Sequence, residues 1–130
     1  MFEISVVGLG FVGLPLLISI SEKKKLLKKI IGIEINNKIG EKKIKSIKNS
    51  KNNNLFLDNK LNKIFSRNKK NINLTINYNN ASNSDFIFFC FPLHITKRLT
   101  TNFHDYCNLI GKYCEIAKSG AIFVFNSTSP

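Results

Sequence analysis

The chain alternates between short apolar runs and stretches whose apolar residues recur at helical spacing. Residues 2–7 form the first apolar run, and a continuous run of this kind is typical of a parallel strand buried on both faces. From residue 11 to about residue 25, apolar side chains recur every three or four positions, which predicts a helix that tolerates Pro15 in its first turn. The chain therefore opens with a strand, a glycine turn and a helix.

The same alternation continues along the chain. Residues 30–35 predict a second strand, residues 72–76 a half-buried strand near a sheet edge, residues 85–91 a central strand and residues 121–125 a last strand. Helices are expected between these strands, and their apolar faces would carry Ile39, Ile44 and Ile47, then Leu57, Leu61, Ile64 and Phe65, and finally Phe103, Tyr106, Cys107, Ile110, Tyr113, Cys114 and Ala117.

This order of elements predicts the fold class. Strands that alternate with helices indicate an α/β protein, and right-handed crossovers restrict it to a doubly wound parallel sheet of the Rossmann-like kind. With 130 residues, 43% of them hydrophobic, the chain can bury one core, so we expect a single domain over residues 1–130. The sequence stops just after the fifth predicted strand, so we expect a truncated sheet whose exposed apolar surface favours association.

The charge changes this picture little. A formal net charge of +12 is typical of proteins that bind polyanions. Lysine, asparagine and isoleucine are enriched together along most of the chain, however, and aromatic residues are not interleaved with lysines as a stacking surface would need. We therefore expect no specific nucleic-acid partner, and we interpret the lysines at 23–25, 28 and 29 as a solvated helix end. No secretory signal or membrane-spanning run is found, which predicts a cytoplasmic protein with no membrane partner.

Cysteine and histidine form no recognisable catalytic or metal pattern. The three cysteines make no CxxC pair and no zinc spacing with His94 or His104, so no metal site is expected. Free thiols are predicted, with Cys107 and Cys114 as small buried side chains on one helix face. Neither histidine has an acid at a spacing that would orient it as a base, so we assign no catalytic residue.

The clearest chemical signal is Gly8-Leu9-Gly10-Phe11-Val12-Gly13, which matches GxGxxG between a predicted strand and a predicted helix. In this context the first glycine permits a tight turn, the second lets a pyrophosphate approach the backbone, and the third lets the helix pack closely on the strand. The free amides at the helix N terminus would then bind the phosphates. Glycine turns also serve only to join a strand to a helix, but the placement of this one favours dinucleotide binding.

A second signal is the acid near the end of the second predicted strand. Glu34 lies 21 residues after Gly13, close to the spacing of about 20 at which an acid accepts hydrogen bonds from the adenosine ribose. Such an acid repels a 2′-phosphate, so the sequence predicts NAD rather than NADP. Lys38 is a further candidate for contact with the adenosine side, and a solvent-facing position is an equal alternative.

These residues resemble the UDP-glucose/GDP-mannose dehydrogenases, which oxidise nucleotide sugars, and especially the branch that makes UDP-hexosaminuronic acids. The most specific part of the resemblance is the glycine turn together with the sequence V-G-L-P-L that continues from it. It continues, in the same order and over nearly the whole chain, through Gly32-Ile33-Glu34-Ile35, the strand over residues 85–91 that ends at Pro92, and Ser127-Thr128.

The resemblance implies an N-terminal NAD-binding domain of a longer dehydrogenase with a role in polysaccharide biosynthesis. It places Cys90, Phe91 and Pro92 beside the cofactor and Ser127 and Thr128 near the nicotinamide. The family usually reads V-P-T-P after the fourth strand, whereas this chain reads Phe91-Pro92-Leu93-His94 and loses a hydroxyl.

The family's catalytic cysteine, its lysine and its C-terminal substrate domain have no counterpart in these 130 residues. The resemblance therefore implies the cofactor half of an enzyme that oxidises the C6 alcohol of a UDP-sugar, of the UDP-glucose or UDP-N-acetylhexosamine type, to a uronate. Alone, this chain would bind NAD without turnover. The alternative is a truncated, non-catalytic dinucleotide-binding module.

Overall fold

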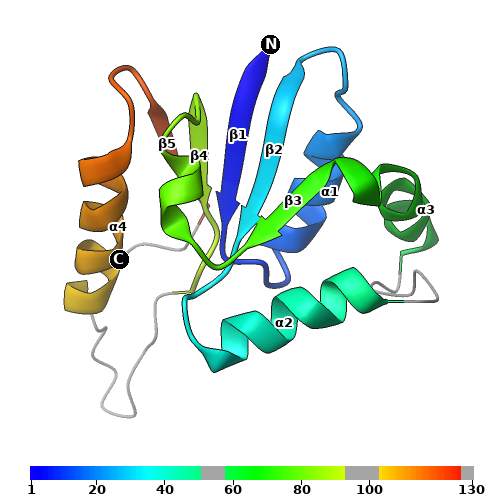
Figure 1. Cartoon of the computed structure of the whole chain (residues 1–130), viewed down its shortest axis with the longest axis horizontal. Helices are drawn as coiled ribbons and strands as arrows, with labels where there is room; N and C mark the ends of the chain where they lie inside the picture. The colour runs from blue at the N-terminus through cyan, green and yellow to red at the C-terminus, as the bar shows by residue number, and fades with distance from the viewer. Residues whose placement is uncertain (51–57, 93–102, 127–130) are drawn as a thin grey trace.

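The computed structural model describes residues 1–50, 58–92 and 103–126, and it contains one parallel sheet with the strand order β3-β2-β1-β4-β5 (Figure 1). The central strand β1 (Phe2–Val7) pairs with β2 (Leu27–Ile33) on one side and with β4 (Phe86–Phe89) on the other. Strands β3 (Ile72–Thr75) and β5 (Ile122–Phe125) form the two edges. The doubly wound parallel sheet is thus confirmed, with its order reversing at β1.

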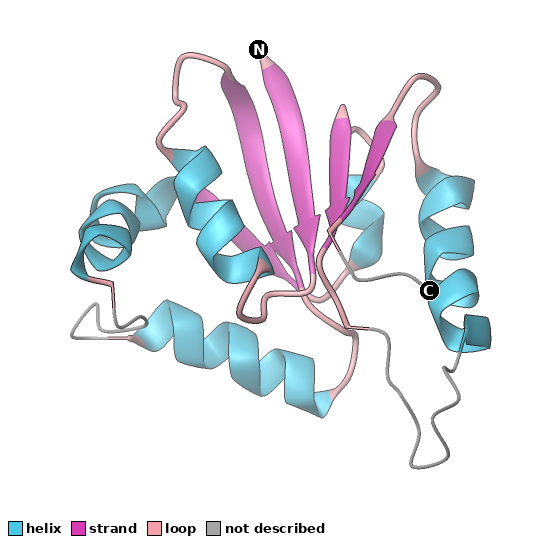
Figure 2. Cartoon of the chain, turned by 180° about the vertical axis from the view of Figure 1, so that it is seen from behind, coloured by secondary structure: helices cyan, strands magenta, loops and turns pink. Residues whose placement is uncertain are grey.

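Helices cover both faces of this sheet (Figure 2). On one face lie α1 (Gly13–Ser21), α2 (Lys38–Asn49) and α3 (Asn59–Asn68), followed by a short 3-10 turn, η1 (Lys69–Asn71). On the other lie α4 (Phe103–Ile116) and the 3-10 turn η2 (Tyr78–Ala81). Each face has its own apolar core: the first contains Val6, Leu14, Leu17, Ile18, Ile44, Ile47, Ile64 and Phe65, and the second contains Ile31, Ile33, Ala81, Ile87, Phe89 and Tyr113.

Side-chain caps determine where two of the helices begin. The Asn37 side chain accepts a hydrogen bond from the Gly40 amide at 2.9 Å, and the Asp58 side chain accepts one from the Lys60 amide at 2.7 Å. After α4, Gly120 adopts a left-handed φ of +81°, a conformation that glycine accepts without strain. In the described part of the chain, no helix combines the length and hydropathy needed to cross a membrane.

Two element boundaries differ from the sequence expectation. Helix α1 ends at Ser21, so the lysines at 23–25 lie in the turn that follows, while Lys28 and Lys29 belong to β2. The predicted lysine-rich helix end was therefore wrong. Strand β2 starts at Leu27 because it pairs with β1 from Phe2 onward, and a Lys28–Glu3 ion pair of 3.0 Å joins the two strands. The strand ends at Ile33, so Glu34 follows it directly.

The predicted inner face of α4 was partly wrong. Tyr113 is buried, and Leu109, Ile110, Ile116 and Ala117 pack around the same core, but Cys107 and Cys114 are exposed rather than buried. Phe103 is also exposed, as is Ile39 on α2. The physical reason on α4 is that the aromatic group formed by Tyr113, Phe89 and Tyr78 sets the rotation of the helix and turns both thiols outward.

This packing predicts that substitutions at two adjacent positions of α4 have very different effects on stability. We expect Tyr113→Ala to lower the free energy of unfolding by about 3–5 kcal/mol, because it removes a fully buried aromatic ring and leaves a cavity. Cys114→Ala should change it by less than about 0.5 kcal/mol, because the thiol is exposed. Urea unfolding of the two variants measures this, and equal losses would contradict the observed rotation of α4.

The burial of Tyr113 also predicts that the folded protein loses stability at alkaline pH. Burial raises the pKa of its hydroxyl well above the usual value, and the charge of Glu34 raises this pKa further. The unfolded chain loses this proton near pH 10 while the folded chain keeps it, so stability is complete below about pH 10 and falls as the pH rises above it. Unfolding curves at pH 8 to 11 should show a shallower decline for Tyr113→Phe than for the wild type. An equally steep decline in both proteins would contradict this role of Tyr113.

Candidate functional site

The turn that joins β1 to α1 requires glycine at its first position. Gly8 has a φ of +87°, and its amide donates to the carbonyl of Ile33 at 2.9 Å. A Cβ at this position would lie 2.9 Å from the amide nitrogen of Phe91 and 3.1 Å from the carbonyl carbon of Cys90. Because backbone atoms cannot move aside as the end of a flexible side chain can, Gly8 holds the first turn tightly against the end of β4.

The third glycine lets the helix lie directly on this turn. A Cβ at Gly13 would overlap the carbonyl oxygen of Gly8 and would lie 3.0 Å from the Cβ of Cys90. Gly13 is the first residue of α1, so this close contact fixes both the start of the helix and its orientation. Gly8, Gly13 and Cys90 therefore form one packed unit beneath the turn.

The middle glycine differs, because it faces open space. A Cβ at Gly10 would meet no heavy atom of the described residues within 4 Å, and Phe11 and Val12 beside it are exposed. Helix α1 has no side-chain cap at its N terminus, and its first turn contains Pro15, which has no amide hydrogen. The amides of this turn thus lie at the positive end of a helix next to room for a ligand, the arrangement that binds a diphosphate.

Glu34 lies at the same end of the sheet and contacts the glycine turn. Its Oε2 accepts a hydrogen bond from the Leu9 amide at 3.1 Å, and its Oε1 accepts one from the Ile35 amide at 3.2 Å. The Nζ of Lys43 lies 2.8 Å from Oε2, and the Glu34 side chain is 11% exposed. The acid and the second residue of the motif, far apart in sequence, are thus brought together.

Of two lysines on α2, Lys38 and Lys43, only the second contacts Glu34 in the described part of the chain. Lys38 is the first residue of α2 and is exposed, without a contact to Glu34 among the described residues. Lys43, one and a half turns further along the helix, makes that contact instead. Sequence reasoning missed Lys43, because a nine-residue separation carries no signal until the direction of α2 relative to β2 is known.

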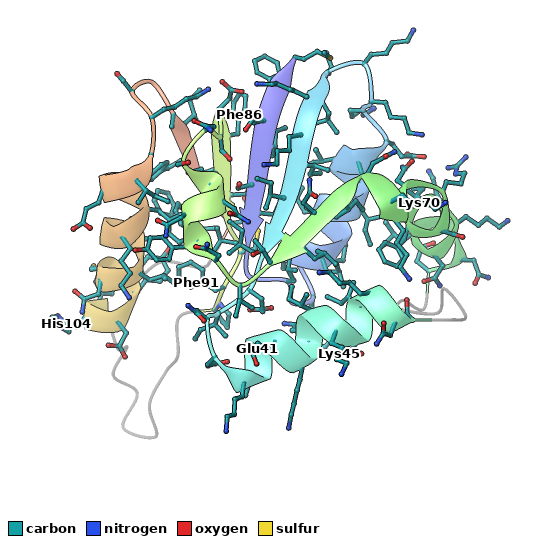
Figure 3. All side chains as sticks on the ribbon, in the orientation of Figure 1. Glu41, Lys45, Lys70, Phe86, Phe91 and His104 are labelled. Carbon is teal, nitrogen blue, oxygen red and sulfur yellow. The ribbon has the colours of Figure 1, made fainter. Side chains whose placement is uncertain are left out.

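The end of β4 completes this edge of the site. The Cys90 amide donates to the carbonyl of Val7 at 2.8 Å, and burial raises the pKa of the Cys90 thiol, which keeps it in its neutral form. Phe91 packs on the Tyr106 ring with centroids 5.0 Å apart, and Pro92 follows it on the surface. Figure 3 shows Phe91 at the end of the sheet from which α2 begins. Ser127 and Thr128, like Leu93 and His94, lie outside the described residues.

In the described part of the chain, no cluster of three or more histidine, cysteine, aspartate or glutamate side chains could hold a metal ion. His104 is exposed at the outer end of α4 (Figure 3), and Cys107 and Cys114 lie on the same helix. What the described residues bring together is suited to binding.

A groove of about 450 Å³ lies elsewhere, between α2 and the edge strand β3. Its walls include Ile44, Lys45, Lys48, Leu74 and Ile76, and none of the glycine turn residues or Glu34 lines it. We therefore place the candidate site at the glycine turn, where the motif, the acid and the helix N terminus converge.

Comparison with known proteins identifies the family of this chain. The family model described as the UDP-glucose/GDP-mannose dehydrogenase family, NAD binding domain, matches residues 2–130. The chain belongs to this family. The predicted resemblance is thus confirmed, and the family assignment supports NAD as the cofactor of this NAD-binding domain.

Similar proteins include one sequence relative and solved structures. Protein CapL from Staphylococcus aureus is 37% identical over 96 residues, which are 73% of this chain and 19% of CapL. The structure of an NDP-N-acetyl-D-galactosaminuronic acid dehydrogenase from Methanosarcina mazei Go1 matches with a TM-score of 0.80 and 21% identity, over 99% of this chain and 28% of that one. A UDP-D-ManNAc dehydrogenase from Pyrococcus horikoshii matches with a TM-score of 0.78 and 18% identity, over 98% and 29%. The chain spans less than a third of each of these proteins.

The glycine geometry predicts that the same substitution costs much more stability at Gly13 than at Gly10. Gly13→Ala should destabilise the fold by roughly 1–3 kcal/mol or more, because the new methyl group overlaps the Gly8 carbonyl and forces α1 away from the turn. Gly10→Ala should cost less than about 1 kcal/mol, because space is open there. Thermal unfolding of both variants tests this, and similar losses would mean that Gly13 is not packed as described.

Proposed function

We propose that this chain is the cofactor-binding part of a dehydrogenase that oxidises the C6 alcohol of a UDP-sugar, of the UDP-glucose or UDP-N-acetylhexosamine type, to a uronate. The observation that carries the proposal is the convergence of an open, amide-lined glycine turn with Glu34 at one end of the sheet. Family membership and the similarity to nucleotide-sugar dehydrogenase structures support it.

In this proposal each part of the site has a distinct role. The amides around Gly10 hold the diphosphate of NAD, and Glu34 accepts hydrogen bonds from the adenosine ribose. The other proposed contacts are Gly8, Phe11, Val12, Gly13 and Lys38 on the diphosphate and adenosine side, and Cys90, Phe91, Pro92, Ser127 and Thr128 toward the nicotinamide.

The chemistry would be shared between this chain and the rest of a longer protein. When bound, NAD accepts a hydride from the substrate alcohol. The residues of this chain bind and orient the cofactor, and the neutral, buried Cys90 packs beneath the turn rather than reacting. We propose that the sugar site and the catalytic groups belong to a substrate domain beyond residues 1–130.

Direct titration tests the binding step. We expect calorimetry to show saturable binding of NAD to the chain below about millimolar concentration. Gly10→Ala should weaken it at least about tenfold, because its methyl group projects into the space where the diphosphate would contact the backbone. Its unchanged unfolding temperature is the control for folding. No saturable binding by the wild type would overturn the proposal.

A second candidate function is a non-catalytic dinucleotide-binding module. It is favoured by Leu93, which stands where the family usually has a hydroxyl. The nucleotide sequence past the codon of Pro130 distinguishes the two. A reading frame that encodes a substrate domain, and whose product forms NADH with UDP-glucose or a UDP-N-acetylhexosamine, supports the enzyme. A stop codon there, with NAD binding intact, supports the module.

A further inference from the structure

The charge around Glu34 has a consequence for the choice between NAD and NADP. An acid after the second strand normally excludes NADP, because its negative charge repels the 2′-phosphate. Here the Nζ of Lys43 lies 2.8 Å from the Oε2 atom of that acid. The group expected to reject the phosphate is therefore accompanied by a positive charge from the neighbouring helix.

The position of Lys43 follows from the tight packing of α2 on the end of β2. A Cβ at Gly40 would overlap the carbonyl oxygen of Ile35, so the first turn of the helix lies directly against the chain that leaves the strand. Asn37 caps the same turn through the Gly40 amide. Lys43 comes three residues after Gly40, nearly one turn along, and so points back toward Glu34.

The hydrogen bonds of Glu34 hold its carboxylate in place, whereas the Lys43 side chain can change its position. Both carboxylate oxygens are already engaged by backbone amides, Oε2 by Leu9 and Oε1 by Ile35, and the side chain is 11% exposed. The Lys43 side chain is 40% exposed, and its flexible stem can carry the ammonium toward a second anion. The carboxylate is thus fixed by the main chain, while the ammonium is free to turn toward solvent.

We propose that Lys43 is a specificity-determining residue that lets this site accept NADP as well as NAD. The inference rests on the proposed binding site and goes beyond it. With Lys43 present, the repulsion between Glu34 and a 2′-phosphate is opposed by an attraction of similar strength, because the two charges lie within hydrogen-bond distance of each other. NAD, which has no 2′-phosphate, gains little from the lysine.

Calorimetric titration with NAD and with NADP, at constant low ionic strength, tests the proposal on the intact chain. We expect Lys43→Gln to raise the Kd for NADP about tenfold and to change the Kd for NAD less than about threefold, the scale of one charge-assisted hydrogen bond. Lys43→Arg should retain NADP binding, because the positive charge remains.

A matched variant separates a local effect from the overall charge of the protein. Lys42→Gln removes the same charge from the neighbouring, exposed position of α2. It should not change the ratio of the two Kd values by more than about twofold. Lys43 is partly exposed on a helix surface, so its variant should fold, and an unchanged unfolding temperature confirms this.

The outcomes distinguish this inference from the proposed function. If the wild type binds NAD and Lys43→Gln leaves the ratio of the Kd values unchanged, or changes it no more than Lys42→Gln does, the role of Lys43 is overturned while the binding site stands. If the wild type binds neither nucleotide, both proposals fail.

Discussion

The contact between the third glycine of the turn and the carbonyl of the first is the constraint on which the site depends. Gly13 begins α1 against the oxygen of Gly8, and Gly8 in turn lies against the backbone at the end of β4. Two segments about eighty residues apart are thereby held at one corner of the sheet. The open space at Gly10 lies between these two closely packed glycines of the motif.

Much of the fold could be predicted because its signals are local. The strand over residues 2–7, the edge position of the strand near Leu74 and the glycine turn follow from apolar runs, alternation and a short motif. The rotation of α4 could not be predicted, because Cys107 and Cys114 recur at helical spacing as well as Tyr113 does. The aromatic contacts of Tyr113 with Phe89 and Tyr78 show which side of the helix faces the sheet.

Some residues of the candidate site could be predicted from the sequence, and others could not. The glycines and Glu34 follow from spacing, since their roles depend on the turn and on the end of the next strand. The surroundings of Glu34 do not, because the Leu9 amide and the Lys43 ammonium reach it from two other segments of the chain. The sequence spacing from the glycine motif thus identifies Glu34. Its contact with Lys43 depends instead on how closely α2 packs at Gly40.

The glycine turn presents main-chain atoms rather than side chains, and this affects how the sequence around it can vary. At the glycine turn the exposed side chains of Phe11 and Val12 project into solvent, and what the fold requires is the absence of side chains at Gly8 and Gly13. A protein can accumulate lysine, asparagine and isoleucine over most of its length and keep such a surface intact, because peptide groups are the same in every residue. Within this turn, mutational tolerance should therefore be lowest at Gly8 and Gly13, where a side chain would meet backbone atoms, and higher at Gly10.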